Sequence, residues 1–168
     1  GWGYRPEASS DTKELERFDF FKAKIINYQF NELVNESGDF HLFDLSYSEG
    51  AFISKDDIVS SFLLINLKFD IPVFILDREN LLGGINENTI YKDLDFPKHP
   101  DFSKRFFLGG KKASEIRSLF DSKLIFFFES HAYFRVESIG KRLLIKGKNR
   151  LSSIQEIKQL LAFSTELI

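Results

Sequence analysis

The segment IVSSFLLINLKF, residues 58–69, decides the fold class of this 168-residue chain. From Leu63 to Phe69 every second residue is apolar, and Asn66 and Lys68 stand between them. Side chains two positions apart point to the same face of a strand. The alternation therefore predicts a β-strand with one face in the protein core.

Two further strands are predicted before this segment. Residues 22–30 alternate in the same way, and residues 40–47 follow after a turn at 36–39. We expect the two strands to pair as an antiparallel hairpin. The apolar phase of the second strand shifts between Leu42 and Phe43, so either both of its faces are covered or a bulge lies there.

Shorter elements flank these strands. Residues 1–9 are expected to be irregular, and an Asp-x-x-Glu capping box at 11–14 predicts a short helix that extends to about Phe18. Residues 73–76 predict a short strand. Asp77 is expected to cap a helix over 78–82 that ends at Gly83-Gly84. Pro97 and Pro100 flank His99 and exclude regular structure at that point.

The last third is predicted to be helical and then hairpin-like. Residues 113–120 carry the apolar stripe of one helix, and Asp121 is expected to cap a second that contains residues 124–128. Residues 133–137 alternate as a strand, Gly140 is expected to turn the chain, and residues 143–145 return as another strand.

A final helix is expected to begin at a capping box. Two pairs of residues fit this motif, Ser152 with Gln155 or Ser153 with Glu156. The whole pattern predicts an α+β fold, in which a mainly antiparallel sheet of about five to seven strands is covered on one side by about three helices. We expect residues 1–168 to form a single soluble domain.

Composition excludes several kinds of chemistry. The chain has no cysteine, which rules out a disulfide, a thiolate nucleophile and a sulfur-ligated zinc site. Its longest apolar run, residues 124–128, is far shorter than the roughly 20 residues of a membrane span. The chain also has no methionine and starts abruptly at Gly1, so we expect a fragment of a longer protein.

Charge is unevenly distributed along the chain. Residues 1–97 carry 9 Lys and Arg against 18 Asp and Glu, whereas residues 98–168 carry 14 against 7. Two interpretations stay open: the halves neutralise each other when packed, or the second half presents a basic face to an anionic lipid or another polyanion. The net charge of −2 argues against a nucleic-acid partner.

No catalytic motif is present. His41, His99 and His131 lie far apart in sequence, without the spacing of a zinc site. No Gly-x-Ser-x-Gly occurs, and neither Gly83-Gly84 nor Gly109-Gly110 belongs to a nucleotide-binding loop. We assign no catalytic, cofactor-binding or metal-binding residue and expect no enzyme activity and no cofactor.

Four weaker patterns have an ordinary structural explanation beside a functional one. Residues 109–112 precede a helix and are interpreted as a loop-to-helix turn or as an anion site at the helix N-terminus. The carboxylate pairs at 56–57 and at 93 and 95 are explained as solvated loop charges. The basic run 141–150 includes a buried-looking strand, and residues 124–128 fit a helical core or a partner surface.

Several short motifs carry a resemblance to a known family. They are Gly1-Trp2-Gly3-Tyr4, Arg17-Phe18, Phe43-Asp44-Leu45-Ser46-Tyr47, Leu76-Asp77-Arg78-Glu79-Asn80-Leu81, His99-Pro100-Asp101-Phe102-Ser103-Lys104-Arg105-Phe106, Leu108 and Gly110. In order and spacing, the chain resembles a family of uncharacterised bacterial proteins that usually carry transmembrane helices ahead of a soluble domain. The motif around His99 is the most distinctive.

The resemblance implies attachment to the bacterial inner membrane through a segment upstream of Gly1, with this domain on the cytoplasmic side. It brings no catalytic residue, and Asp44, His99 and Arg105 are explained as well by packing as by function. We expect an interaction or scaffolding domain with a protein partner, with Trp2 and Tyr4 near the lipid headgroups and a basic surface from residues 98–150 on the same side.

Two alternatives to this function remain. One is a hydrolase whose site lies near Asp44 and His99, which requires the two side chains to converge in a pocket. The other is a lipid-binding or small-molecule-binding module, which requires a cavity between the sheet and the helices.

Overall fold

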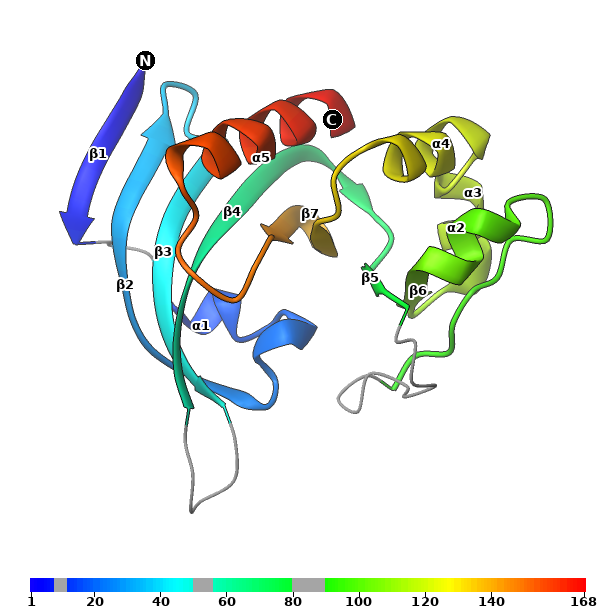
Figure 1. The fold of residues 1–168 in the computed structure, drawn as a ribbon, viewed down its shortest axis with the longest axis horizontal. Coiled ribbons are helices and arrows are strands. Elements are labelled where there is room, and N and C mark those ends of the chain that lie inside the picture. Colours follow the sequence, from blue (N-terminus) through cyan, green and yellow to red (C-terminus); the bar gives the residue numbers. More distant parts are fainter. Residues whose placement is uncertain (8–11, 50–55, 80–89) are drawn as a thin grey trace.

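The computed structural model describes residues 1–7, 12–49, 56–79 and 90–168. Within these ranges the chain forms one antiparallel sheet of seven strands in the order β1-β2-β3-β4-β7-β5-β6 (Figure 1). The strands are β1 (Trp2–Glu7), β2 (Lys24–Asn35), β3 (Phe40–Glu49), β4 (Asp56–Ile71), β5 (Phe74–Arg78), β6 (Phe106–Gly110) and β7 (Arg135–Lys146).

The helical segments complete an α+β fold, which confirms the predicted class. They are α1 (Thr12–Leu15), the 3-10 helix η1 (Asp19–Phe21), α2 (Pro100–Arg105), α3 (Ala113–Leu119), α4 (Ser122–Ser130) and α5 (Ile154–Leu167). No helix in the described ranges combines the length and the apolar character that crossing a bilayer requires.

Strand β4 is the centre of the sheet and is covered on both of its faces. It contains the predicted strand 58–69 and extends it at both ends. Leu63 and Ile65 point into a larger core shared with α2–α5, while Phe62 points into a smaller core shared with α1 and η1. All three side chains are fully buried. Helices α2–α5 therefore cover one face of the sheet, as expected, and α1 and η1 cover the other face, which was not predicted.

The phase shift in β3 has the same cause. Leu42 contributes to the larger core and Phe43 to the smaller one. The pairing of β3 with β4 runs without a shift from Phe40 to Glu49, so the first of the two interpretations is correct. Bulges lie instead in β2, where its register against β3 shifts after Ile26 and again after Phe30.

Residues expected to be irregular form the edge strand β1. The predicted hairpin of β2 and β3 is confirmed, and β1 adds to its free side by pairing Trp2 with Asn35 and Glu7 with Phe30. Pro6 has no ladder partner, which a sheet edge tolerates. The strand was missed because its stability comes from β2 rather than from an apolar period of its own.

Strand β7 corrects the predicted hairpin at Gly140. Residues 135–146 are one strand, in which Val136 and Glu137 pair with β5 while Gly140 and residues 142–146 pair with β4. Gly140 has a φ of 58°, which only glycine adopts at little cost. The glycine therefore bends a single strand that joins two parts of the sheet, and the two halves do not pair with each other.

Three local predictions around residues 77–110 also change. Asp77 and Arg78 end β5 instead of starting a helix, and residues 80–89 lie outside the described ranges. His99 is the N-cap of α2, and Pro100 opens that helix, where a missing N–H costs nothing. Strand β6 follows directly and was not predicted; a Cβ on its Gly110 would collide with the carbonyl oxygen of Val73.

The C-terminal helices follow the predicted capping signals. Asp121 caps α4 by accepting hydrogen bonds from two backbone amides. Ser153 and Glu156 form the capping box of α5, which selects the second of the two expected pairs. In the apolar run 124–128, Ile125 and Phe128 are buried, while 66% of Phe126 is exposed. The run is thus mainly helical core.

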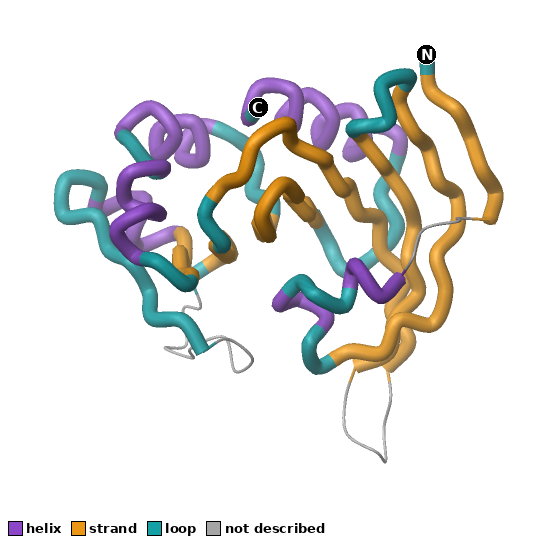
Figure 2. Tube along the Cα trace, turned by 180° about the vertical axis from the view of Figure 1, so that it is seen from behind, coloured by secondary structure: helices purple, strands orange, loops and turns teal. Residues whose placement is uncertain are grey.

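The arrangement separates the two ends of the molecule. Helices α2–α4 lie beside β5 and β6, whereas β1 is at the opposite end of the curved sheet (Figures 1 and 2). Helix α5 lies between these ends and packs Leu160 and Phe163 into the larger core.

We predict that Gly140→Ala lowers the free energy of unfolding by about 1–2 kcal/mol, the cost of a left-handed conformation for a residue with a Cβ. The new methyl group would also lie 3.3 Å from Asp70 Oδ1. Urea denaturation measures the loss. Gly3→Ala is the matched control, because its Cβ would meet only Val34 O at 3.9 Å. Equal stability of the two variants would contradict the role given to Gly140.

Candidate functional site

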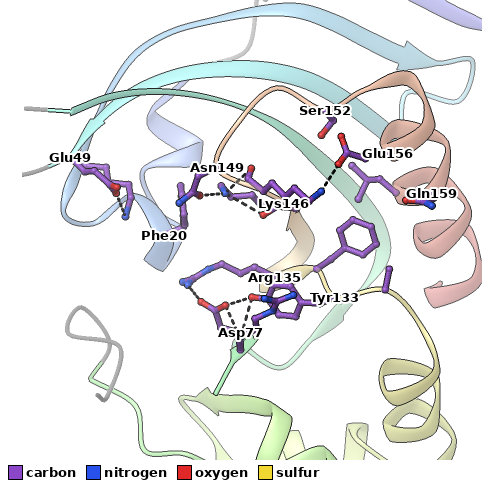
Figure 3. Close-up of a pocket in the computed structure, with 17 residues that line it drawn as sticks. Phe20, Glu49, Asp77, Tyr133, Arg135, Lys146, Asn149, Ser152, Glu156 and Gln159 are labelled. Atoms are coloured by element: carbon purple, nitrogen blue, oxygen red, sulfur yellow. Dashed lines mark hydrogen bonds and ion pairs between the residues drawn. The ribbon is translucent and has the colours of Figure 1, made fainter. Parts of the chain in front are cut away.

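A cavity of about 680 Å³ lies where β7, β5 and the beginnings of β2 and α5 come together (Figure 3). Its charged lining residues are Lys24, Glu49, Asp77, Arg78, Arg135, Lys146, Lys148 and Glu156. Phe20, Tyr133, Phe134 and Leu160 supply the larger apolar surfaces. Among the described residues, five basic groups and three acidic ones thus line the cavity.

The bend at Gly140 brings the two ends of β7 into this cavity. In a straight strand, Arg135 and Lys146 would lie roughly 36 Å apart, at about 3.3 Å per residue. Instead, Arg135 Cζ lies 5.4 Å and Lys146 Nζ lies 5.2 Å from the centre of the Phe20 ring. Both cations therefore contact the same aromatic side chain.

Phe20 is a shared platform for three cations. Lys24 Nζ lies 4.4 Å from the ring centre, closer than Arg135 or Lys146. The Phe20 ring also packs edge-to-face against the ring of Phe21, at a centroid distance of 4.9 Å. An aromatic face stabilises a nearby cation by about 0.5–2 kcal/mol. The Phe20 ring therefore attracts all three positive side chains, although they repel one another.

Arg135 is neutralised by carboxylates on both sides. Its guanidinium donates hydrogen bonds to Asp77, and its Nε and Nη2 donate to Glu137 Oε1 at 2.7 and 2.5 Å. The Tyr133 hydroxyl donates a hydrogen bond to Asp77 Oδ1. Burial raises the pKa of Tyr133, and the Asp77 carboxylate raises it further, so the phenol stays protonated.

Glu137 connects this network to the Phe20 platform. Only 2% of Glu137 is exposed, and burial raises the pKa of its carboxyl while Arg135 acts in the opposite direction. The backbone N–H of Phe20 donates to both oxygens of this carboxylate, at 3.1 and 3.2 Å. The hydrogen bonds hold η1 against β7.

Lys146 differs from Arg135 because it has no carboxylate partner among the described residues. Only 4% of Lys146 is exposed. Its ammonium donates to Asn149 Oδ1 at 2.5 Å and to the carbonyl oxygens of Lys148 and Gly147 at 3.2 and 3.4 Å. Burial lowers the pKa of Lys146 to about 8, and the positive charge of Arg135 contributes, while the more distant carboxylates of Asp77 and Glu49 act in the opposite direction.

The segment 147–152 covers Lys146 and is held in place at its far end. Lys148 and Arg150 both pair with Glu156 in the first turn of α5. The backbone N–H of Ser152 donates to Ser61 Oγ on β4 at 2.9 Å. The covering segment is therefore fixed to both α5 and the central strand.

Asp44, one of the two residues proposed for a hydrolase site, belongs to the same support. Its carboxylate accepts hydrogen bonds from Ser61 Oγ at 2.7 Å and from Asn31 Nδ2 at 2.9 Å. Tyr4 donates to Asn31 Oδ1 at 3.0 Å. A chain of polar contacts thus crosses four strands, from β1 to the residue that holds the covering segment.

The structure does not bring Asp44 and His99 together. His99 precedes α2 and its Nε2 contacts Ser122 Oγ at 3.0 Å, while β3 and α2 lie in separate parts of the molecule in both views (Figures 1 and 2). Arg105, on α2, donates to the backbone carbonyl oxygen of Glu129. The two proposed residues therefore have different partners in different parts of the fold.

The other two histidines also lie apart. His41 contacts Glu32 Oε1 through Nδ1 and Gly38 O through Nε2, both at 3.0 Å. His131 joins the end of α4 to Glu166 on α5. Within the described part of the chain, no group of three His, Asp or Glu side chains is arranged to hold a metal ion.

The remaining sequence candidates have structural roles. Gly109 and Gly110 belong to β6, and Lys112 pairs with Glu115 at the start of the short helix α3. Asp93 accepts hydrogen bonds from the amides of Leu94 and Leu108, and burial raises the pKa of its carboxyl.

The last two sequence candidates are the carboxylate pair at 56–57 and the basic run 141–150. Residues 56 and 57 begin β4, so their interpretation as loop charges was wrong. Asp57 accepts a hydrogen bond from Ser48 Oγ at 2.6 Å, and the side chain of residue 56 lies outside what the structure describes. The basic run 141–150 is divided: Lys146 enters the cavity, Lys148 and Arg150 pair with Glu156, and Arg142 pairs with Glu14.

Comparison of the chain with protein-family models, with curated proteins and with solved structures gave no match. The cavity was not located by sequence reasoning. Its one local signal was Lys146, a charged residue directly after the apolar segment 143–145 within the basic run.

We predict that Arg135→Met lowers the free energy of unfolding by about 3–5 kcal/mol, because it leaves buried carboxylates without their cation. Adding Glu137→Gln to this variant should restore part of the loss. Lys112→Met is the control, since its pair with Glu115 is exposed and contributes at most about 1 kcal/mol. Chemical denaturation gives all three values, and equal losses for Arg135→Met and Lys112→Met would contradict the network.

We further predict that wild-type stability rises relative to Lys146→Met as the pH increases from 8 to 10.5. In this window the folded state has released the Lys146 proton, whereas the unfolded chain, with the ordinary pKa of 10.5, still binds it. Stability rises with pH where the unfolded state binds more protons. Urea titrations of both proteins at each pH measure the difference in their free energies of unfolding, to which titrating groups common to both do not contribute. A difference that does not change with pH would contradict the lowered pKa of a buried Lys146.

Proposed function

We propose that this domain is a non-enzymatic binding module for a small organic anion, which occupies the cavity floored by Phe20. The observation that carries the proposal is Lys146, a buried ammonium facing a cavity without a carboxylate partner among the described residues. A buried charge is costly unless it is paired. A carboxylate or phosphate of a ligand would supply the pairing that the chain itself does not.

The neighbouring charges favour the same class of ligand. Arg135 and Lys24 share the Phe20 platform with Lys146. Each has its own acidic partner, with Lys24 3.3 Å from Glu49 Oε2. Their charges are thus fixed in position, and an incoming anion needs to compensate only Lys146.

The cavity also selects for an apolar portion in the ligand. Leu160 belongs to α5, and the Phe134 ring packs against Phe163 of the same helix. Tyr133 and Gln159 lie across from Phe20 (Figure 3). Binding sites of this size combine apolar walls with a few placed polar groups. A carboxylate attached to an aromatic or aliphatic group fits both halves of this lining.

The resemblance to bacterial membrane proteins supports a location for this module. We place it on the cytoplasmic side of an inner membrane, attached through a segment upstream of Gly1, where ligand occupancy would control contact with a protein partner. The headgroup position of Trp2 and Tyr4 gains no support from the fold, since α2–α4, with many of the basic residues, lie at the opposite end (Figure 1).

The proposal is tested by calorimetric titration with phenylacetate and with its neutral analogue phenylacetamide. We expect phenylacetate to bind and phenylacetamide to bind at least tenfold more weakly, because hydrogen bonds to charged groups contribute about 1.5–3 kcal/mol.

Lys146→Met should weaken phenylacetate binding by a similar factor. Lys123→Met, the same substitution at an exposed site on α4, should leave it unchanged. Equal affinity for the acid and the amide, or an equal effect of the two variants, would rule out the anion site.

A further inference from the structure

We propose that Lys146 captures its ligand covalently, by forming an imine with an organic anion that carries a ketone or aldehyde next to its carboxylate. This inference rests on the proposed anion-binding function and names the ligand class more closely, as a 2-oxo acid. It adds a covalent step to a site that the proposed function describes as binding its ligand non-covalently.

The surroundings of Lys146 are those of a nucleophilic amine. A lysine is activated when it is desolvated or placed beside another cation. Both conditions hold here, since Lys146 is buried and shares the Phe20 platform with Arg135 and Lys24. Its hydrogen-bond acceptors are neutral oxygens, from Asn149 and two backbone carbonyls.

These surroundings supply neutral amine at physiological pH. With a pKa of about 8, about a tenth of Lys146 is unprotonated at pH 7, against roughly one in three thousand for a lysine with the ordinary value. The difference distinguishes Lys146 from exposed lysines of the same chain.

The cavity also orients the reacting groups. A 2-oxo acid whose carboxylate pairs with Lys146 carries its ketone on the adjacent carbon, next to the same nitrogen. Holding two reactants together in this way replaces a bimolecular encounter by a reaction within one complex. Lys148, at the rim, is instead paired with Glu156.

The reaction balances without an oxidant, a reductant or a further cofactor. The nitrogen lone pair attacks the carbonyl carbon, and a C–N bond forms as the carbonyl π electrons move to oxygen. The resulting carbinolamine loses its oxygen as water, which takes up two protons that the amine nitrogen held. The product is a C=N bond, and hydrolysis reverses the process.

The experiment is reductive trapping of the intact protein with phenylpyruvate and sodium cyanoborohydride, followed by peptide mapping by mass spectrometry. We expect the reduced adduct on Lys146 at no less than about ten times the occupancy of any other lysine. Phenyllactate, which has a hydroxyl in place of the ketone, should bind with similar affinity and give no adduct.

A variant tests the site of reaction. Lys146→Arg removes the primary amine, so trapping with phenylpyruvate should give no adduct at position 146. Trapping on the unmodified protein does not depend on the folding of this variant, because the other lysines serve as internal controls.

Adducts spread evenly over exposed lysines such as Lys123, or no adduct while phenyllactate still binds, would overturn the imine and leave the anion site standing. Failure of phenyllactate itself to bind would overturn the anion site and the imine together.

Discussion

The left-handed backbone at Gly140 determines how the sheet is built. It turns β7 so that residues before it pair with β5 and residues after it pair with β4. Without this bend, the β5–β6 pair and helices α2–α4 would have no strand connecting them to the central sheet. The same bend places both ends of β7 against Phe20, so one backbone conformation creates both the continuous larger core and the charged cavity.

The pairing of charged side chains in the cavity reflects the free-energy cost of removing charges from water. Arg135 lies between Asp77 and Glu137, which compensate its burial. Lys146 is less exposed than Arg135, yet it donates its hydrogen bonds to neutral oxygens and has no ion-pair partner among the described residues. A buried ammonium without an ion-pair partner is costly, and this cost is the reason for proposing an anion site here.

The candidate site was only partly accessible from sequence, for reasons that particular residues show. Lys146 could be seen as a charge at the end of an apolar strand, but its distance from Arg135 depends on the bend between them. Phe20 is one of twenty phenylalanines, and nothing in its neighbourhood indicates a platform for cations. Asp44 was selected for its place in a motif. Its carboxylate instead accepts a hydrogen bond from Ser61, and Ser61 holds the segment that covers Lys146.

The sequence by itself determined the features that depend on neighbouring residues: the alternation of β4, the cap of α4, a capping box near the start of α5, and the hairpin of β2 and β3. These follow because side-chain periodicity and capping act over a few positions. Only the tertiary structure decided that Trp2–Glu7 is a strand, that β7 is continuous through Gly140, and that both sheet faces are covered. Each of these depends on hydrogen bonds or apolar contacts between segments far apart in the chain, which local patterns do not encode.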